Sequence, residues 1–309
     1  MSKNTMTVMQ EKDLQRTTAS QRIVQILVKV IVYSFLIAMA VIVLFPFYWM
    51  IISSLKTLDE YRLSQPTFFP QTIMFSNYAE AFTTASLGRL FINTMIVGVA
   101  STLLSLIITV LSAFAFARLE FKGKELLFSG LLATMMIPGE LFTITNFVTV
   151  TEFGWRNTYT VLIVPFLVSV FYIFLLRQNF MQIPNELYLA AKVDGTSDLK
   201  YLWKVMVPLS LPTLISITIL KMMGAWNSYA WPNLVCKDEA YQLITNGLRS
   251  AQFNVTNVLP DGTEIVLEGI VNYPVQMAAV TLVSLPLFLV FIFLRKYIMK
   301  GVSRSGIKG

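Results

Sequence analysis

Residues 30–52 read VIVYSFLIAMAVIVLFPFYWMII, a run without a single charged side chain. A bilayer core about 30 Å thick is crossed by roughly 20 apolar residues in a helix, so this run is long enough to span a membrane. It is also too long for the apolar core of a cleaved signal peptide, which indicates that the segment is retained. The sequence therefore predicts a membrane-spanning helix near the N-terminus.

Five further stretches share this length and apolar character. Because backbone groups in lipid must be hydrogen-bonded internally, we expect all of them to be helical. The chain is thus predicted to be an all-α integral membrane protein with six transmembrane helices. The predicted spans are Val30–Ile52, Leu90–Ala117, Leu126–Val150, Thr158–Leu176, Leu209–Trp231 and Pro274–Leu294.

The overall composition agrees with a membrane protein and excludes several kinds of site. Hydrophobic residues make up 55% of the chain and charged residues 13%, whereas soluble domains carry about 25% charged residues. The sequence has no histidine and one cysteine, which excludes histidine-based catalysis, histidine zinc sites and internal disulfides. We predict no catalytic residue and no metal site.

The basic residues predict the orientation of the chain. Seventeen of the 24 Lys and Arg residues lie in the N-terminal tail, the 118–125 and 177–208 loops and the C-terminal tail. By the positive-inside rule these segments, and hence both termini, are expected to be cytoplasmic. The net charge of +7 then orients helices and needs no nucleic-acid partner. We divide the chain into a cytoplasmic tail (1–29), a six-helix domain (30–294) and a second cytoplasmic tail (295–309).

The 177–208 loop, RQNFMQIPNELYLAAKVDGTSDLKYLWKVMVP, is expected to form two short helices. Pro184 suits the first turn of one helix, Glu186 favours the same end, and Gly195 suits its C-terminal cap. Ser197 or Asp198 can cap the second helix, which Pro208 ends. Along it, four apolar residues at helical spacing form a stripe: Leu199, Leu202, Trp203 and Met206. The pattern alone fits a docking element for a partner protein and an amphipathic helix on lipid equally well.

Several motifs identify a family resemblance that covers most of the chain from about residue 30. The chain resembles membrane subunits of bacterial ATP-binding-cassette (ABC) importers for carbohydrates, and among these the second permease of the maltose type. The 177–208 loop is similar to the family's EAA loop through AAKVDGTS and LWKVMVPLSLP. The other matching motifs are FSNYAEAF (75–82), FINT (91–94), AFAFARLEFKGK (113–124), MMIPGE (135–140), WNSYAWP (226–232) and RKYIMKGVSRSGIKG (295–309).

The resemblance implies a type I ABC importer permease fold in the bacterial inner (plasma) membrane. It implies a homologous second permease, a cytoplasmic ATPase dimer and an extracytoplasmic sugar-binding protein as partners, besides membrane lipid. One departure from the family is Leu189, where the family has a glutamate that helps anchor the ATPase; Glu186 or Asp194 could replace that contact. The residues that the resemblance assigns to ATPase coupling are Glu186, Ala190, Ala191, Asp194, Gly195, Pro208, Gly306, Lys308 and Gly309.

The expected function is that of a non-catalytic subunit in an ATP-driven importer of a sugar, in particular an oligosaccharide. The chain has no G-x-x-x-x-G-K-[ST] phosphate loop, so it binds no cofactor, and the partner ATPase is expected to use ATP and Mg²⁺. Two alternatives stay open at this point: a permease for a non-sugar solute of the same importer class, and a polytopic membrane enzyme.

Four residues in or near the spans are candidates for the translocation path. Ionisable groups inside a membrane are costly and face a cavity or a partner, which draws attention to Glu140 and Lys221. Either could instead lie near an interface and extend its charge to water. Trp226 and Asn227 could stack on a sugar and bond its hydroxyls, or belong to an ordinary interfacial aromatic belt.

Overall fold

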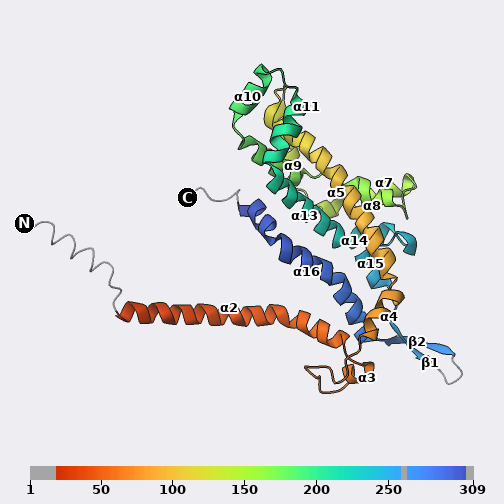
Figure 1. Cartoon of the computed structure of the whole chain (residues 1–309). Helices are drawn as coiled ribbons and strands as arrows, with labels where there is room; N and C mark the ends of the chain where they lie inside the picture. Colours follow the sequence, from red (N-terminus) through yellow and green to blue (C-terminus); the bar gives the residue numbers. More distant parts are fainter. Residues whose placement is uncertain (1–18, 259–262, 304–309) are drawn as a thin grey trace, which may run out of the picture.

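The computed structural model describes residues 19–258 and 263–303, and most of these are helical (Figure 1). The expected helical fold is confirmed, with one small addition, a two-stranded hairpin. The elements are α2 (Ala19–Ser54), α3 (Leu58–Tyr61), α4 (Ser76–Thr84), α5 (Leu87–Arg118), α6 (Lys124–Thr134), η1 (Gly139–Phe142), α7 (Thr143–Glu152), α8 (Tyr159–Ile163), η2 (Val164–Phe166), α9 (Val170–Met181), α10 (Asn185–Val193), α11 (Asp198–Tyr201), η3 (Leu202–Met206), α12 (Val207–Leu209), α13 (Leu211–Trp226), α14 (Ala230–Val235), η4 (Glu239–Tyr241), α15 (Ile244–Ser250), β1 (Asn254–Val258), β2 (Glu264–Val271) and α16 (Tyr273–Ser303).

Among the described residues, three helices are long and apolar enough to cross a membrane by themselves. They are formed by Val24–Ser54, Leu87–Arg118 and Tyr273–Arg295. Three further candidates are bent helix pairs, which raises the possible number of spans to six by length and composition. The six stretches expected from the sequence each overlap one of these helices or pairs.

The bent pairs break where proline or a capping serine interrupts the helix. The pair α6 and η1–α7 bends by 83° at Pro138, which lacks a backbone N–H and disfavours helix in the preceding residue. The pair α8–η2 and α9 bends by 45°, and the Ser169 hydroxyl caps α9 by accepting from the Tyr172 N–H. The pair α11–α12 and α13 bends by 80° between Pro208 and Pro212. The prolines at 138, 165 and 212 were expected to kink the predicted spans, and each lies in one of the three bent pairs.

Two predicted boundaries also differ in the structure. Helix α2 is helical from the first described residue, Ala19, well before the expected start at Val30, because residues 19–29 contain no proline or glycine to stop a helix. The expected span Leu209–Trp231 covers a helix end, since α13 stops at Trp226 and α14 starts at Ala230.

Helix α5 lies at the centre of the bundle and contacts α4, α8, α9, α13 and α15 (Figure 1). Three apolar clusters lie along it, each containing at least one α5 residue, such as Leu90, Val97 and Val110. The buried face of α5 is also rich in serine and threonine, including Ser101 and Thr109. These small polar side chains allow neighbouring helices to approach closely.

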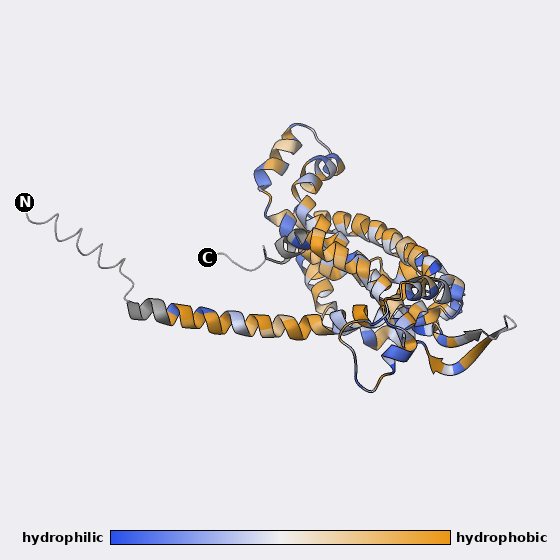
Figure 2. Ribbon diagram, turned by 60° about the horizontal axis from the view of Figure 1, so that its bottom comes forward, coloured by the Kyte–Doolittle hydropathy of each residue, from blue (hydrophilic) through white to orange (hydrophobic). Residues whose placement is uncertain are grey.

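Helix α2 extends away from the bundle, and it is predominantly apolar after Lys29 (Figure 2). Its most apolar stretch is entirely unburied within the chain. It packs mainly against α16, where Phe47 and Phe288 form an edge-to-face pair with ring centroids 5.2 Å apart. Its C-terminal Ser54 also bonds Tyr78 and Asn77 of α4. An apolar helix surface of this size requires lipid or another apolar surface around it.

The two strands β1 and β2 form an antiparallel hairpin between α15 and α16. The sequence predicted an all-α fold without strands, and the hairpin corrects that prediction. Its sequence, NVTNV and EIVLEGIV, is rich in the β-branched residues that favour strands.

Candidate functional site

Residues 177–208, here called the two-helix loop, are closed by a turn whose geometry the sequence predicted. Helix α10 ends at Val193, and Gly195 adopts a left-handed conformation with φ +70°. The Thr196 N–H donates to the Ala191 carbonyl at 2.8 Å, and the Gly195 N–H donates to the Lys192 carbonyl at 3.0 Å. This pair of bonds is a Schellman motif, and glycine suits its left-handed position because it has no Cβ.

The start of each loop helix lies within one residue of its expected position. Pro184 precedes α10 as its N-cap, and Glu186 lies in the first turn. Ser197 is the N-cap of α11, but its side chain makes no capping bond, and the helix continues through Pro208 to Leu209.

A cluster of three polar side chains holds α10 against α11. The Lys192 ammonium lies 2.7 Å from an Asp198 carboxylate oxygen, and the Tyr188 hydroxyl donates to the same oxygen at 2.8 Å. The hydrogen bond with Asp198 raises the pKa of Lys192 above its usual range. Partial burial, together with the neighbouring carboxylate, raises the pKa of Tyr188. The cluster fixes the angle between the helices on either side of Gly195.

The predicted apolar stripe of the second loop helix divides into two halves. Leu202 and Met206 are fully buried against α5 and α9, whereas Leu199 and Trp203 are exposed. The two pairs lie on neighbouring sides of the helix, of which only the Leu202 and Met206 side faces the bundle, and the segment Leu202–Met206 forms a π-helical turn. The loop is therefore attached to the bundle by one side and presents apolar groups on the other.

The exposed side of the two-helix loop carries the residues that the sequence analysis assigned to coupling. Glu186, Ala190, Asp194, Gly195 and Pro208 are exposed, while Ala191 packs partly against the buried cluster. Further apolar side chains lie exposed beside them: Leu187, Leu189 and Val193, the last 87% exposed. Gly306, Lys308 and Gly309, the remaining coupling candidates, lie outside the described residues.

Two arginines join the base of the two-helix loop to the bundle. Arg118, in the last turn of α5, donates to the carbonyls of Phe180 and Ile183 at 3.0 and 2.5 Å, just where α9 ends. Arg177 lies over the Phe128 ring at 4.1 Å and pairs with Glu125 at 3.3 Å. A cation at the C-terminal end of a helix bonds its free carbonyls and interacts favourably with the helix dipole.

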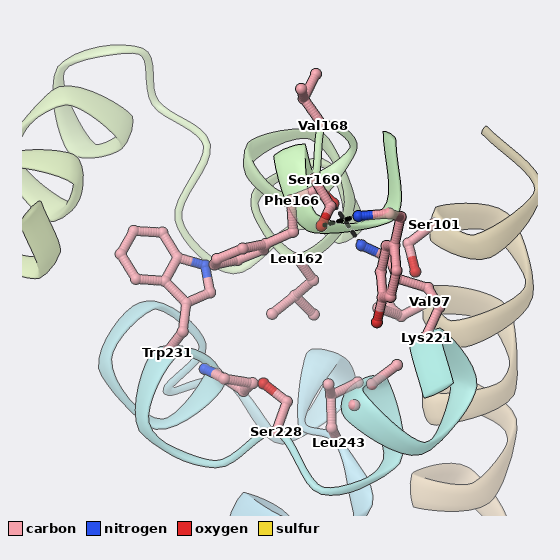
Figure 3. A pocket seen from close by; sticks show the side chains of 14 residues that line it. Val97, Ser101, Leu162, Phe166, Val168, Ser169, Lys221, Ser228, Trp231 and Leu243 are labelled. Atoms are coloured by element: carbon pink, nitrogen blue, oxygen red, sulfur yellow. Dashed lines mark hydrogen bonds between the residues drawn. The ribbon is translucent and has the colours of Figure 1, made fainter. Parts of the chain in front are cut away.

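A second feature is a partly open cavity of about 370 Å³ between α5, the α8–α9 break, α13 and α14 (Figure 3). Lys221 points to the break, and its ammonium donates to the Phe166 carbonyl at 2.5 Å. This bond satisfies a carbonyl that the interrupted helix leaves free. The residues that line the cavity are Val97, Ser101, Leu162, Phe166, Val168, Ser169, Tyr172, Lys221, Gly224, Ala225, Ser228, Trp231, Pro232 and Leu243.

The structure does not bring the four path candidates together. Lys221 lines the cavity, whereas Glu140 lies exposed at the α6–α7 break. Trp226 is 7% exposed and packs beside Phe91, with ring centroids 5.5 Å apart. Asn227 is exposed and donates from its side chain to a carbonyl of its own helix.

Comparison with known proteins identifies the family. Residues 107–304 match the family described as "Binding-protein-dependent transport system inner membrane component". The chain belongs to this family. This result confirms the resemblance to ABC importer permeases, and it places the chain among multi-pass inner-membrane components.

Relatives of the family match over nearly the whole chain. The chain is 31% identical over 297 residues to the melibiose/raffinose/stachyose import permease protein MelC of Bacillus subtilis, covering 94% of this chain and 98% of the relative. It is 30% identical over 275 residues to the diacetylchitobiose uptake system permease protein NgcG of Streptomyces coelicolor, covering 88% and 87%. A solved bacterial ABC transporter involved in the import of the polysaccharide alginate has the same fold, with a TM-score of 0.76, 24% identity and coverage of 91% and 99%.

Within this family fold, the sequence did not reveal the roles of Tyr188 and Arg118 or the cavity-lining residues other than Lys221. Arg118 entered the sequence analysis only as a charge that orients the chain, because the carbonyls that it bonds, at the end of α9, lie more than 60 residues away. No local pattern indicated the hydrogen bond of the Tyr188 hydroxyl, because its acceptor Asp198 lies ten residues away across a turn.

Proposed function

We propose that this chain is one of two membrane-spanning subunits of an ATP-driven importer of oligosaccharides. It crosses the bacterial cell membrane six times with both termini in the cytoplasm. The names of the MelC and NgcG relatives, which refer to sugar uptake, support the substrate class. The excess of Lys and Arg on the termini and on residues 118–125 and 177–208 supports the orientation.

The observation that carries the proposal is the two-helix loop with its exposed apolar face. A surface with Leu187, Leu189 and Val193 exposed beside two small alanines suits close contact with another protein. Because the opposite side of the loop is buried against α5 and α9, a push on the loop acts on the bundle. In the proposed importer this face contacts a separate ATPase dimer, which uses ATP and Mg²⁺, since the chain has no phosphate-binding loop.

The remaining partners follow from the same proposal. A homologous second permease lies against this chain in the membrane and covers part of its apolar surface. An extracytoplasmic sugar-binding protein delivers the solute to the opposite side from the two-helix loop. At the two-helix loop, Leu189 takes the place of an anchoring acid, so apolar contact carries more of the docking.

Cysteine accessibility tests both the orientation and the docking. The native Cys236 is buried, and burial raises the pKa of its thiol to about 11, so it reacts poorly with maleimides. Val193→Cys reports on the two-helix loop, and Phe69→Cys, on an exposed residue of the 62–75 segment, is the matched control. We expect an impermeant maleimide to label Val193→Cys only in inside-out vesicles, and ATPase subunits to protect it.

Phe69→Cys should be labelled from the outside of intact cells and should not change when the ATPase is added. Labelling of Val193→Cys from outside would contradict the orientation. Unchanged labelling with the ATPase bound would contradict the docking role. Transport by the purified chain without an ATPase would contradict the proposed function as a whole.

A further inference from the structure

The cavity between α5, α9, α13 and α14 is lined by a single charged side chain, that of Lys221. Of the fourteen residues that line it, Lys221 is charged and the others are apolar, hydroxyl-bearing or glycine. The ion pairs among the described residues are Glu120 with Lys124, Glu125 with Arg177, and Asp198 with Lys192, so none of them neutralises Lys221. The cavity therefore has a net positive charge.

The Lys221 ammonium has donors left for a ligand. It carries three N–H groups, and one of them bonds the Phe166 carbonyl. A cation with a single neutral partner in an apolar helical bundle is costly, and such groups face a cavity or a partner. An anion in the cavity would supply both the missing charge and the missing acceptors.

The walls of the cavity suit a solute that combines a polar edge with an apolar face. The hydroxyls of Tyr172 and Ser228 have no hydrogen-bond partner within the described part of the chain, and both residues line the cavity. On the other side, the rings of Phe166 and Trp231 meet edge to face with centroids 5.7 Å apart (Figure 3). Free hydroxyls can bond sugar hydroxyls, and aromatic rings can pack on the C–H face of a sugar ring.

We propose that this cavity is a subsite for an acidic sugar, in which the anionic group of the sugar binds the Lys221 ammonium and the ring lies against Phe166 and Trp231. The anionic group is a carboxylate, as in a uronic acid, or a phosphate ester. This inference rests on the proposed function, because it makes the cavity part of the route that the imported solute takes. A volume of about 370 Å³ lies at the lower end of the range of small-molecule sites, about 300–1,000 Å³.

The test measures equilibrium binding to the assembled importer in nanodiscs, without the sugar-binding protein, so that the affinity reports on the membrane subunits. The probes are a galacturonate disaccharide, the corresponding neutral galactose disaccharide and a hexose phosphate. The variants are Lys221→Met, which removes the charge, Lys221→Arg, which keeps it, and the control Lys237→Met, which removes an exposed lysine outside the cavity.

We expect the wild type, Lys221→Arg and Lys237→Met to bind at least one anionic probe about 10- to 100-fold more tightly than the neutral probe, the size of a hydrogen bond to a charged group. Lys221→Met should lose that preference and keep the affinity for the neutral sugar. The stronger of the two anionic probes identifies carboxylate or phosphate as the preferred group.

Equal affinity of the wild type for all three probes would overturn the proposal, and so would a preference that Lys221→Met retains. If Lys221→Met fails to assemble, the wild-type preference and its retention in Lys221→Arg still decide the matter. ATP-driven uptake of the neutral sugar distinguishes failure of the subsite proposal from failure of the proposed function. Uptake without anion preference refutes the subsite alone, whereas the absence of ATP-dependent uptake of any sugar refutes the proposed function.

Discussion

The turn at Gly195 offers a quantitative test of the two-helix loop. With φ +70°, this residue has a backbone conformation that costs an ordinary L-amino acid about 1–2 kcal/mol. A Cβ at this position would meet no described atom within 4 Å, so a substitution to alanine acts through the backbone and not through crowding inside the chain. A cost of about 1–2 kcal/mol lowers the population of the closed turn about 5- to 30-fold.

Gly195→Ala should therefore reduce solute uptake per ATP hydrolysed, measured in proteoliposomes with the complete importer. Gly195→Asn should reduce uptake per ATP hydrolysed by less than Gly195→Ala does, because asparagine tolerates the left-handed backbone region. The matched control is Gly130→Ala in α6, where a Cβ also meets nothing within 4 Å but the backbone is helical, so the substitution should be neutral or slightly stabilising. Equal effects of alanine and asparagine at Gly195, or equal damage at Gly130, would refute the reasoning.

Three further predictions concern other contacts. Arg118→Gln should lower thermal stability by about 1.5–3 kcal/mol and reduce uptake per ATP hydrolysed, because the free carbonyls at the end of α9 lose a charged donor; unchanged unfolding and coupling would contradict this. Asp198→Ala should broaden the distribution of distances between spin labels on the exposed faces of α10 and α11, because it removes the partner of Lys192 and Tyr188. In the wild type the pKa of Lys192 is raised and that of Asp198 is lowered, so the contact should persist through neutral pH and be lost on the alkaline side only as the pH rises through the raised pKa of Lys192; broadening near neutral pH would count against it. Gly247→Ala places a Cβ 2.3 Å from Leu90 Cδ2, so the melting temperature should fall by the equivalent of about 1–3 kcal/mol, and adding Leu90→Ala should recover part of the loss; additive effects would disprove the clash.

The sequence predicted best those features that depend on neighbouring residues. The ends of α10 follow from Pro184 and Gly195, whose backbone preferences act within a few residues. The long apolar runs predicted α2, α5 and α16 because composition alone distinguishes a helix that can span a bilayer.

Contacts between distant segments of the chain could not be predicted from the local sequence. Arg118 bonds carbonyls more than 60 residues along the chain, and Lys221 bonds a carbonyl 55 residues away. The π-helical turn at Leu202–Met206 could not be predicted either, because no local sequence pattern indicates it. The cavity is a product of four segments, so its lining was visible only after they were assembled.

The isolation of α2 has a consequence for how the protein is made. Its most apolar stretch is unburied within the chain, and the equivalent stretch of α5 is 44% buried and lined with serine and threonine. Insertion of α2 into the bilayer is therefore governed by its own composition and needs no helix synthesised after it. The buried polar face of α5, by contrast, gains its partners only when α9 and α13 have left the ribosome. The helices synthesised after α2 can thus assemble beside a segment that already holds the nascent chain in the membrane.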